Sequence, residues 1–343
     1  MGFLVPMEEA KKSSSSQREN CCTLLVQYTF HDALVADSSG VTPETAWQPD
    51  CPLRIQALAR LGRAGRSMFE TSRISTSEYL KKIGVAQLPP CTSPFDPGYD
   101  PATLESHLEQ SSHLMSILKV SMACWMVAKE SATRQKVAAA KRHQVPTVTG
   151  GGPFEIAVAQ GQLPAYLDLC AELGFTRIEC GEGFTDMPLE AKDVVQMAHQ
   201  RNLEVQFELG KKHAGSFTEE VVQCLVEQGQ RWLDAGALQL VVEGRESAKG
   251  VGLFDDQGNL NRAFADRFVE AFGFQTVIFE APNKPSQFAL LDHFGREVHL
   301  CNVRLEELLR VEIYRRGLHS DAFAKANLRP LDPSRELAQA LIG

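Results

Sequence analysis

The sequence lacks the features that mark membrane proteins, secreted disulfide scaffolds and thiolate metal sites. No apolar run in its 343 residues approaches the roughly 20 residues of a membrane-spanning helix, and the N-terminus shows no cleavable signal pattern. The nine cysteines are scattered, and none forms a C-x-x-C pair. This usage favours reduced thiols in a reducing compartment. We therefore expect a cytoplasmic protein without a membrane partner.

An excess of positive charge is also absent. The 35 lysine and arginine residues face 43 aspartate and glutamate residues, which gives a formal net charge of −8. Nucleic acid is therefore not an expected partner, although a local basic site can still bind a small anion on an acidic protein. At 43% hydrophobic residues, the chain is long enough to bury one large core or two modest ones.

The chain divides into three parts by composition. Residues 1–75 lack a clean hydrophobic period and contain the polar run Ser13–Ser16, so we expect an N-terminal extension that is partly disordered. Residues 76–330 carry a regular pattern that predicts the catalytic domain, and residues 331–343 form a C-terminal tail.

Within the middle part, short apolar runs alternate with segments of helical periodicity. Eight such alternations in roughly 230 residues predict parallel strands with right-handed crossovers, in the α/β class. Eight units of this length are typical of a (β/α)₈ TIM barrel. The rival is a doubly wound sheet, which would more often carry a G-x-G-x-x-G turn after its first strand, and none is present there. The predicted strands are Leu88–Asp96, Leu114–Val120, Pro146–Thr149, Thr176–Glu179, Leu203–Glu208, Leu238–Val242, Thr276–Glu280 and Glu297–Val303.

Four of these strands end in a glutamate. The runs TRIE, VQFE, LVVE and VIFE place Glu179, Glu208, Glu243 and Glu280 where the apolar residues stop. In a barrel the carboxyl ends of neighbouring strands meet at one mouth. Clustered carboxylates repel one another unless a cation lies among them, and hard oxygen ligands select Mg²⁺ or a similar ion. We predict that these four residues bind Mg²⁺; ion pairs with nearby basic residues are the alternative.

Basic residues follow the same strand ends. Lys211 and Lys212 come directly after Glu208-Leu209-Gly210. If the strand geometry persists, period-two alternation points Lys212 with Glu208 and Lys211 away from it. Lysine and arginine beside a metal suit a small polyanion such as a phosphate or carboxylate ester. The other basic or amide candidates at the mouth are Lys119, Arg245, Lys249, Lys284, Asn302, Arg315 and Arg316.

Several longer stretches between residues 147 and 323 resemble the phosphosulfolactate synthase family of (β/α)₈ barrels. They are GGPFEIAVAQG, LGFTRIE, FELGKK, VVEGRESAKGVGLFD, VIFEAPNKPSQ and RRGL. The resemblance implies a carbon–sulfur lyase that adds sulfite to phosphoenolpyruvate with Mg²⁺ and forms (2R)-phospho-3-sulfolactate. It assigns catalysis to Lys212 and Lys211, with Lys212 as the general acid that protonates C2. The remaining anion-binding candidates are Lys119, Arg245, Lys249, Lys284 and Asn302.

Three strand ends depart from the pattern of that family. Asp96-Pro97-Gly98 lacks the lysine of the usual Asp-Lys-Gly, and Lys119 to Ala123 lacks the usual glycines. Gly181-Glu182-Gly183 stands where Ser-Asp-Gly is usual. Two other hypotheses therefore stay open: a non-catalytic, stress-associated or interaction protein of the same superfamily, and a Schiff-base aldolase that uses a barrel lysine. Self-association into a homo-oligomer is also left open.

Overall fold

The computed structural model describes residues 74–120, 122–323 and 325–328. The expected N-terminal extension lies outside the described residues except for its last two, and the expected tail at 331–343 lies wholly outside them. None of the described helices is both long and apolar enough to span a membrane.

Eight parallel strands form a closed barrel in which each strand pairs with the next and β1 pairs with β8. This arrangement confirms the (β/α)₈ TIM barrel and excludes a doubly wound sheet, which would leave two open edges. The first strand begins later than predicted, after the two prolines at its expected start, because proline has no N–H to donate to the sheet. The strands are β1 (Thr92–Asp96), β2 (Leu118–Val120), β3 (Thr147–Thr149), β4 (Arg177–Gly181), β5 (Glu204–Leu209), β6 (Gln239–Val242), β7 (Val277–Glu280) and β8 (His299–Arg304).

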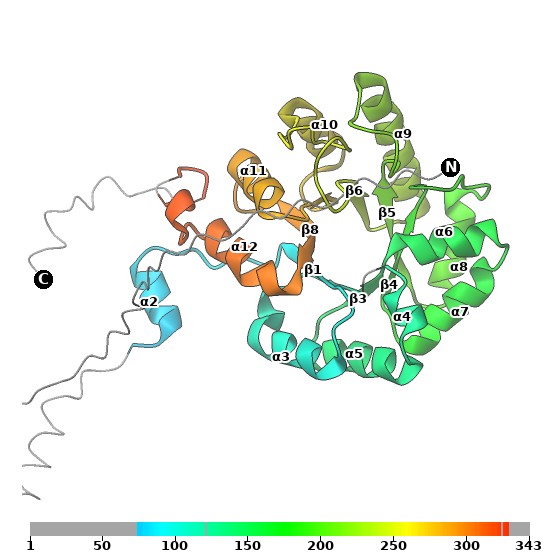
Figure 1. Ribbon diagram of the computed structural model, residues 1–343, viewed down its shortest axis with the longest axis horizontal. Coiled ribbons are helices and arrows are strands. Elements are labelled where there is room, and N and C mark those ends of the chain that lie inside the picture. Colours follow the sequence, from blue (N-terminus) through cyan, green and yellow to red (C-terminus); the bar gives the residue numbers. More distant parts are fainter. Residues whose placement is uncertain (1–73, 121, 324, 329–343) are drawn as a thin grey trace, which may run out of the picture. The chain divides into compact units, whose positions relative to one another are not determined.

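Helices cover the outside of the strand ring (Figure 1). Local sequence sets their ends: the Thr218 side chain caps the longest of them, and Gly236 ends it in the left-handed conformation. The helices are α2 (Thr76–Lys82), α3 (Pro101–Ser111), α4 (Cys124–Val127), α5 (Glu130–Arg142), α6 (Gly151–Ala159), α7 (Leu163–Leu173), α8 (Ala191–His199), α9 (Glu219–Ala235), α10 (Arg262–Phe272), α11 (Lys284–Phe294) and α12 (Leu308–Arg315).

The main apolar core lies between the strands and this helical layer. Phe207 of β5 stacks on Trp232 of α9 with ring centroids 4.2 Å apart, and both rings are buried. One turn earlier on α9, Gly229 lets the helix approach the sheet, because a Cβ there would lie 2.8 Å from Leu240 and 2.6 Å from Phe272. This close packing fixes β5 and β6, the two strands that carry Glu208 and lead into Glu243.

A buried arginine ties the barrel together at the amino-terminal ends of β1 and β8. Arg315, fully buried at the end of α12, donates hydrogen bonds to the carbonyl oxygens of Cys91 and Val298 and pairs with Glu312 at 3.1 Å. Arg316 also pairs with Glu312. The expectation that these two arginines lie beside the carboxylates is therefore wrong. The helix after β8 runs back along the barrel, which brings its last turn to the opposite end.

Replacing Arg315 by alanine is expected to lower the free energy of unfolding by about 3–5 kcal/mol. The change leaves the carbonyl groups of Arg296 and Val298 without their donor and removes one of the two arginines paired with the buried Glu312 carboxylate. Urea unfolding followed by circular dichroism measures the loss. Arg142→Ala is the control, because its pair with Glu105 is exposed and such pairs contribute about 1 kcal/mol or less. Equal losses in the two variants would contradict the assignment.

Candidate active site

The carboxyl ends of the strands open into a cavity of roughly 510 Å³. All four predicted glutamates line it, and each is almost fully buried. Glu179 and Glu208 lie near the ends of β4 and β5, Glu280 is the last residue of β7, and Glu243 follows β6 directly. Parallel pairing in register brings these strand ends to one mouth. The sequence prediction that the four residues share one site is therefore confirmed.

Three of the four carboxylates form a tighter cluster. Glu208, Glu243 and Glu280 each offer an oxygen atom, and these atoms all lie within 4.8 Å of one another. Mg²⁺ and Ca²⁺ bind oxygen at about 2.0–2.6 Å, so two ligands on opposite sides of one ion lie roughly 4–5 Å apart. The cluster contains only carboxylate oxygens, which suits a hard divalent cation and not a thiolate–imidazole zinc site. These three residues fit a metal site.

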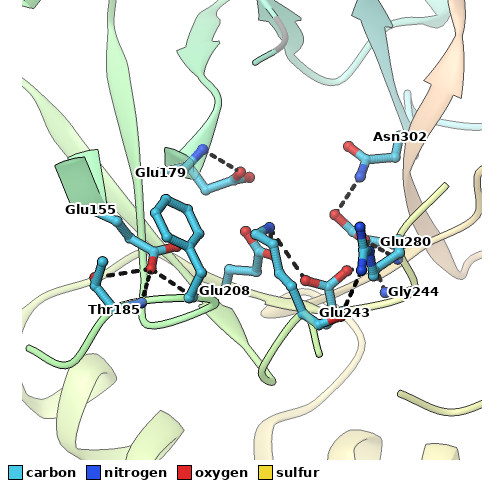
Figure 2. Close-up of polar contacts among 12 residues, drawn as sticks. Glu155, Glu179, Thr185, Glu208, Glu243, Gly244, Glu280 and Asn302 are labelled. Carbon is cyan, nitrogen blue, oxygen red and sulfur yellow. Dashed lines mark hydrogen bonds and ion pairs between the residues drawn. The ribbon is translucent and has the colours of Figure 1, made fainter. Parts of the chain in front are cut away.

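Glu179 lies in the same cavity but outside this cluster (Figure 2). Its carboxylate pairs with Lys119 of β2 at 2.8 Å and accepts hydrogen bonds from the backbone N–H of Gly151 and the side chain of Gln206. Lys119 fills the space between Glu179 and Glu280, from which its ammonium is 3.9 Å away. These contacts place Glu179 in an ion pair at the edge of the site.

Lys212 reaches the cluster from the chain after β5. Its Nζ lies 2.7 Å from Glu208 Oε1 and 3.3 Å from Glu243 Oε2. Lys211 points the other way: its side chain is exposed and pairs with Asp186 at 3.1 Å. The two side chains point in the predicted directions, but strand alternation is not the reason: β5 ends at Leu209, and Gly210 turns the chain with a φ of 122°. Of the two residues to which the sequence assigned catalysis, only Lys212 lines the cavity.

Burial and neighbouring charge shift the pKa values of two carboxyls in opposite directions. Burial raises the pKa of Glu243 to about 11, with Glu280 and Glu208 adding to the effect. For Glu208, burial is outweighed by the Lys212 ammonium and by a hydrogen bond from Glu243, which lower its pKa to about 2. In the metal-free protein at neutral pH, Glu243 therefore holds a proton that it shares with ionised Glu208.

The two lysines of the cavity stay charged. Burial alone would lower their pKa values, but the carboxylates around Lys119 and Lys212 outweigh burial and raise both pKa values above the usual lysine range. A Schiff-base lysine needs the opposite, a depressed pKa that exposes the free amine. The site geometry therefore argues against the aldolase hypothesis.

Ion pairing alone does not account for all the acidic residues. Glu280 has no ion pair at hydrogen-bond distance among the described residues; it accepts hydrogen bonds from the backbone N–H groups of Gly244 and Arg245 and from the Asn302 amide. The two lysines in contact with the four carboxylates can neutralise two of them when all four are ionised. The guanidinium groups of Arg245 and Arg304 also line the cavity, but they contact the Lys212 carbonyl and Glu306. A divalent cation held by Glu208, Glu243 and Glu280 would reduce the remaining repulsion among the carboxylates.

The remaining predicted residues divide into two groups. Arg245 and Asn302 line the cavity: the Arg245 guanidinium donates to the carbonyl of Lys212, and Asn302 accepts from Lys119 at 2.9 Å. Lys249 is exposed and does not line the cavity. Lys284 also lies outside it, 3.8 Å from Asp321. The structure does not bring these last two to the site: Lys249 lies on an exposed loop, and Lys284 is the half-exposed first residue of α11.

Sequence reasoning missed two residues near the site. Arg304 ends β8, lines the cavity and lies over the Phe95 ring at 5.8 Å. The strand was predicted to end one residue earlier, at Val303. Arg304 nevertheless carries the same signal as the glutamates, a charged residue at the end of an apolar strand. The second is Glu155 on α6, which is completely buried. Its signal is a carboxylate inside the apolar run from Pro153 to Ala159.

A closed (β/α)₈ barrel with a buried carboxylate–lysine cluster at its catalytic end defines a barrel enzyme. Residues 90–321 match the family model of (2R)-phospho-3-sulfolactate synthase, ComA. This chain belongs to the phosphosulfolactate synthase family and is a lyase, as the sequence predicted.

Three phosphosulfolactate synthases are similar to this chain over most of their length. That of Methanocaldococcus jannaschii is 32% identical over 231 residues, 67% of this chain and 92% of that protein. That of Methanothermobacter thermautotrophicus is 28% identical over 238 residues, which are 69% of this chain and 92% of that protein. That of Bacillus subtilis is 26% identical over 233 residues, which are 66% of this chain and 90% of that protein.

Binding of a divalent cation is expected to release a proton. Because Glu243 carries one in the metal-free protein, affinity should rise about tenfold per pH unit between about pH 6 and pH 9. Paramagnetic resonance of free Mn²⁺ measures the affinity, with Mn²⁺ as the probe. Glu243→Gln should bind Mn²⁺ more weakly and lose this pH dependence. An unchanged slope in that variant would contradict the assignment.

The same proton affects folding. The folded chain keeps it while the unfolded chain, with an ordinary glutamate pKa of 4.5, has released it. Glu243 therefore makes the metal-free protein less stable as pH rises from about 4.5 toward 11. Thermal unfolding in the presence of a chelator measures this effect for wild type and Glu243→Gln. The melting temperature should fall less in the variant than in wild type as pH rises over that range.

Proposed function

We propose that this protein catalyses the Mg²⁺-dependent addition of sulfite to phosphoenolpyruvate, which forms (2R)-phospho-3-sulfolactate. The observation that carries the proposal is the contact of the Lys212 ammonium with Glu208 and Glu243, two members of the metal-compatible cluster. A proton donor beside a site for a divalent cation is the pair that enol chemistry at a carboxylate requires. Membership of the family supports the substrates.

The cavity has the charge and size for two small anions. Arg245 and Arg304 line its rim, and both present guanidinium groups that can bind a phosphate or carboxylate through two hydrogen bonds. The backbone at Gly150 to Gly152, where α6 begins, lines the same cavity, and the amino end of a helix favours negative charge. We assign phosphoenolpyruvate to this rim, with Lys119 and Asn302 beneath it.

The proposed reaction forms a carbon–sulfur bond at C3 of phosphoenolpyruvate. The sulfur lone pair of sulfite attacks C3, and the electrons of the C2–C3 π bond move to C2 and its carboxylate. Lys212 then donates a proton from Nζ to C2, which completes phosphosulfolactate without loss of the phosphate. Mg²⁺, when bound, supplies positive charge against the negative charge that develops on the carboxylate.

Lys212 can serve as an acid only when its proton is less firmly held. Glu208 and Glu243 raise its pKa in the metal-free protein. If Glu208 and Glu243 held a divalent cation, their attraction for the Lys212 ammonium would weaken, and the pKa of Lys212 would fall from its raised value. Loss of the Glu243 proton would accompany the same change.

The thiols support the proposed compartment. Cys91, Cys170, Cys180, Cys224 and Cys301 are free thiols, and all but Cys224 are buried. Free thiols are typical of a reducing environment, so we propose that the enzyme acts in the cytoplasm on small anionic substrates.

Purified protein incubated with phosphoenolpyruvate, sulfite and Mg²⁺ is expected to form a phosphorylated sulfonate. Phosphorus NMR and mass spectrometry detect the product, and omission of either substrate or addition of a chelator should prevent it. The synthase of Methanocaldococcus jannaschii, assayed in parallel, is the control. If that enzyme is active and this protein yields no product, the proposed function is wrong.

Lys212→Ala is expected to lower kcat about 10²- to 10⁴-fold, the usual contribution of a positioned general acid. The melting temperature should also fall, because the change leaves the buried Glu208 carboxylate without its ion-pair partner; kcat is therefore compared on protein that circular dichroism shows to be folded. Lys211→Ala is the matched comparison: its ion pair is exposed, so kcat should change by less than about fivefold. Wild-type turnover in Lys212→Ala would remove the acid assignment.

A further inference from the structure

A buried carboxylate next to the mouth anchors the loop after β4. Glu155, on α6, is 0% exposed. Its Oε2 accepts hydrogen bonds from the backbone N–H groups of Phe184 and Thr185, both at 2.9 Å, and from the Thr185 hydroxyl at 3.1 Å (Figure 2). Three donors from two adjacent residues thus converge on one oxygen atom. Loss of these three hydrogen bonds would leave buried polar groups unpaired, so this contact holds the loop firmly.

The anchored loop is in direct contact with Lys212. The carbonyl of Gly183, one residue before Phe184, accepts a hydrogen bond from the backbone N–H of Lys212 at 2.8 Å. This bond joins the loop after β4 to the chain after β5. The position of Lys212 therefore depends on a loop that Glu155 holds.

Gly183 also defines the path of the lysine side chain. A Cβ at this position would lie 2.7 Å from Cε and 2.9 Å from Cγ of Lys212, and 3.1 Å from Oε1 of Glu155. The side chain of Lys212 thus passes over Gly183, in the space that any other residue would fill. That path brings its ammonium to Glu208 and Glu243.

Glu155 has one oxygen that the loop does not use. Its Oε1 accepts no hydrogen bond from the described residues and lies toward Gly183 and Gly181, where added Cβ atoms would come within 3.1 and 3.7 Å. Burying a carboxylate is costly unless strong contacts offset it. Here the offsetting contacts all go to the loop that positions Lys212.

We propose that Glu155 is a positioning residue for Lys212, acting through the loop from Gly181 to Thr185. The carboxylate fixes the loop, and Gly183 fixes both the backbone and the side-chain path of the lysine. The inference rests on the proposed function insofar as Lys212 is the proton donor. Misplacement of a reacting group by about 1 Å can lower the rate about 100-fold, so loss of this support should appear in turnover.

Gly183→Ala tests the side-chain path. The clash falls on side-chain atoms, Cε and Cγ of Lys212, and not on backbone, so the chain should fold and the ammonium should move. We expect kcat to fall at least about tenfold, with the KM for phosphoenolpyruvate changed less than about threefold. The melting temperature should stay near that of wild type.

Two substitutions of Glu155 test the anchor. Glu155→Ala removes every contact with the loop and should lower kcat as Gly183→Ala does. Glu155→Gln keeps an acceptor oxygen for the loop and should restore most of the turnover lost in the alanine variant. Glu172→Gln is the control, because its side chain is 72% exposed on α7, and its kcat should match wild type.

A second readout needs no substrate. Amine-specific labelling followed by peptide mass spectrometry measures the reactivity of Lys212, which two carboxylates protect in wild type. Labelling of Lys212 should be at least about fivefold faster in Gly183→Ala and Glu155→Ala, while exposed Lys211 serves as the internal reference. This measurement still decides the role of Glu155 if wild type forms no phosphosulfolactate.

The outcomes separate positioning from a purely structural role. Lower turnover or faster Lys212 labelling in folded Gly183→Ala and Glu155→Ala, with recovery in Glu155→Gln, supports the proposal. The proposal would be overturned if these variants had lower melting temperatures but kept the wild-type kcat and the wild-type rate of Lys212 labelling. If Glu155→Ala does not fold, Gly183→Ala and Glu155→Gln decide the question alone.

Discussion

The balance between buried carboxylates and two lysines at one end of the barrel is the interaction on which the site depends. Four acidic side chains are removed from water there, and each must be compensated because the low dielectric makes an isolated buried charge very costly. Lys119 compensates Glu179, Lys212 compensates Glu208, and Glu243 instead keeps a proton. On full ionisation the oxygens of Glu208, Glu243 and Glu280, all within 4.8 Å of one another, would repel, and a divalent cation among them would relieve that repulsion.

The two ends of the barrel have separate tasks. At the amino-terminal end, Arg315 joins the segments that lead into β1 and β8 and thereby supports closure of the barrel. At the carboxyl end, the carboxylates and lysines form the candidate active site, and the clustered carboxylates repel one another. This separation follows the general division of labour in barrel enzymes. Glu155 adds a third component, a connection between a helix and the loop that supports Lys212.

Much of the fold and part of the site could be predicted. Apolar runs separated by helical segments identify eight strands because burial imposes their pattern, and glutamates at four strand ends meet because parallel strands in register end together. The residues predicted less well lie in loops and after the last strand. Arg315, Lys249 and Lys284 carry charge at the right distance along the chain, but the direction in which a helix or loop runs places them elsewhere.

The sequence by itself determined the barrel and its acidic mouth, because the hydrophobic period and the residues at strand ends are local properties of the chain. The directions of Lys211 and Lys212 depend on the turn at Gly210 and on the hydrogen bond from Lys212 to Gly183. Only the tertiary structure decided that Glu179 pairs with Lys119 while the other three glutamates converge. It alone revealed that Glu155 and Lys212, far apart in the chain, are joined through Gly183. Such contacts depend on the distances between side chains of different helices, strands and loops, and these distances cannot be read from the spacing of residues along the chain.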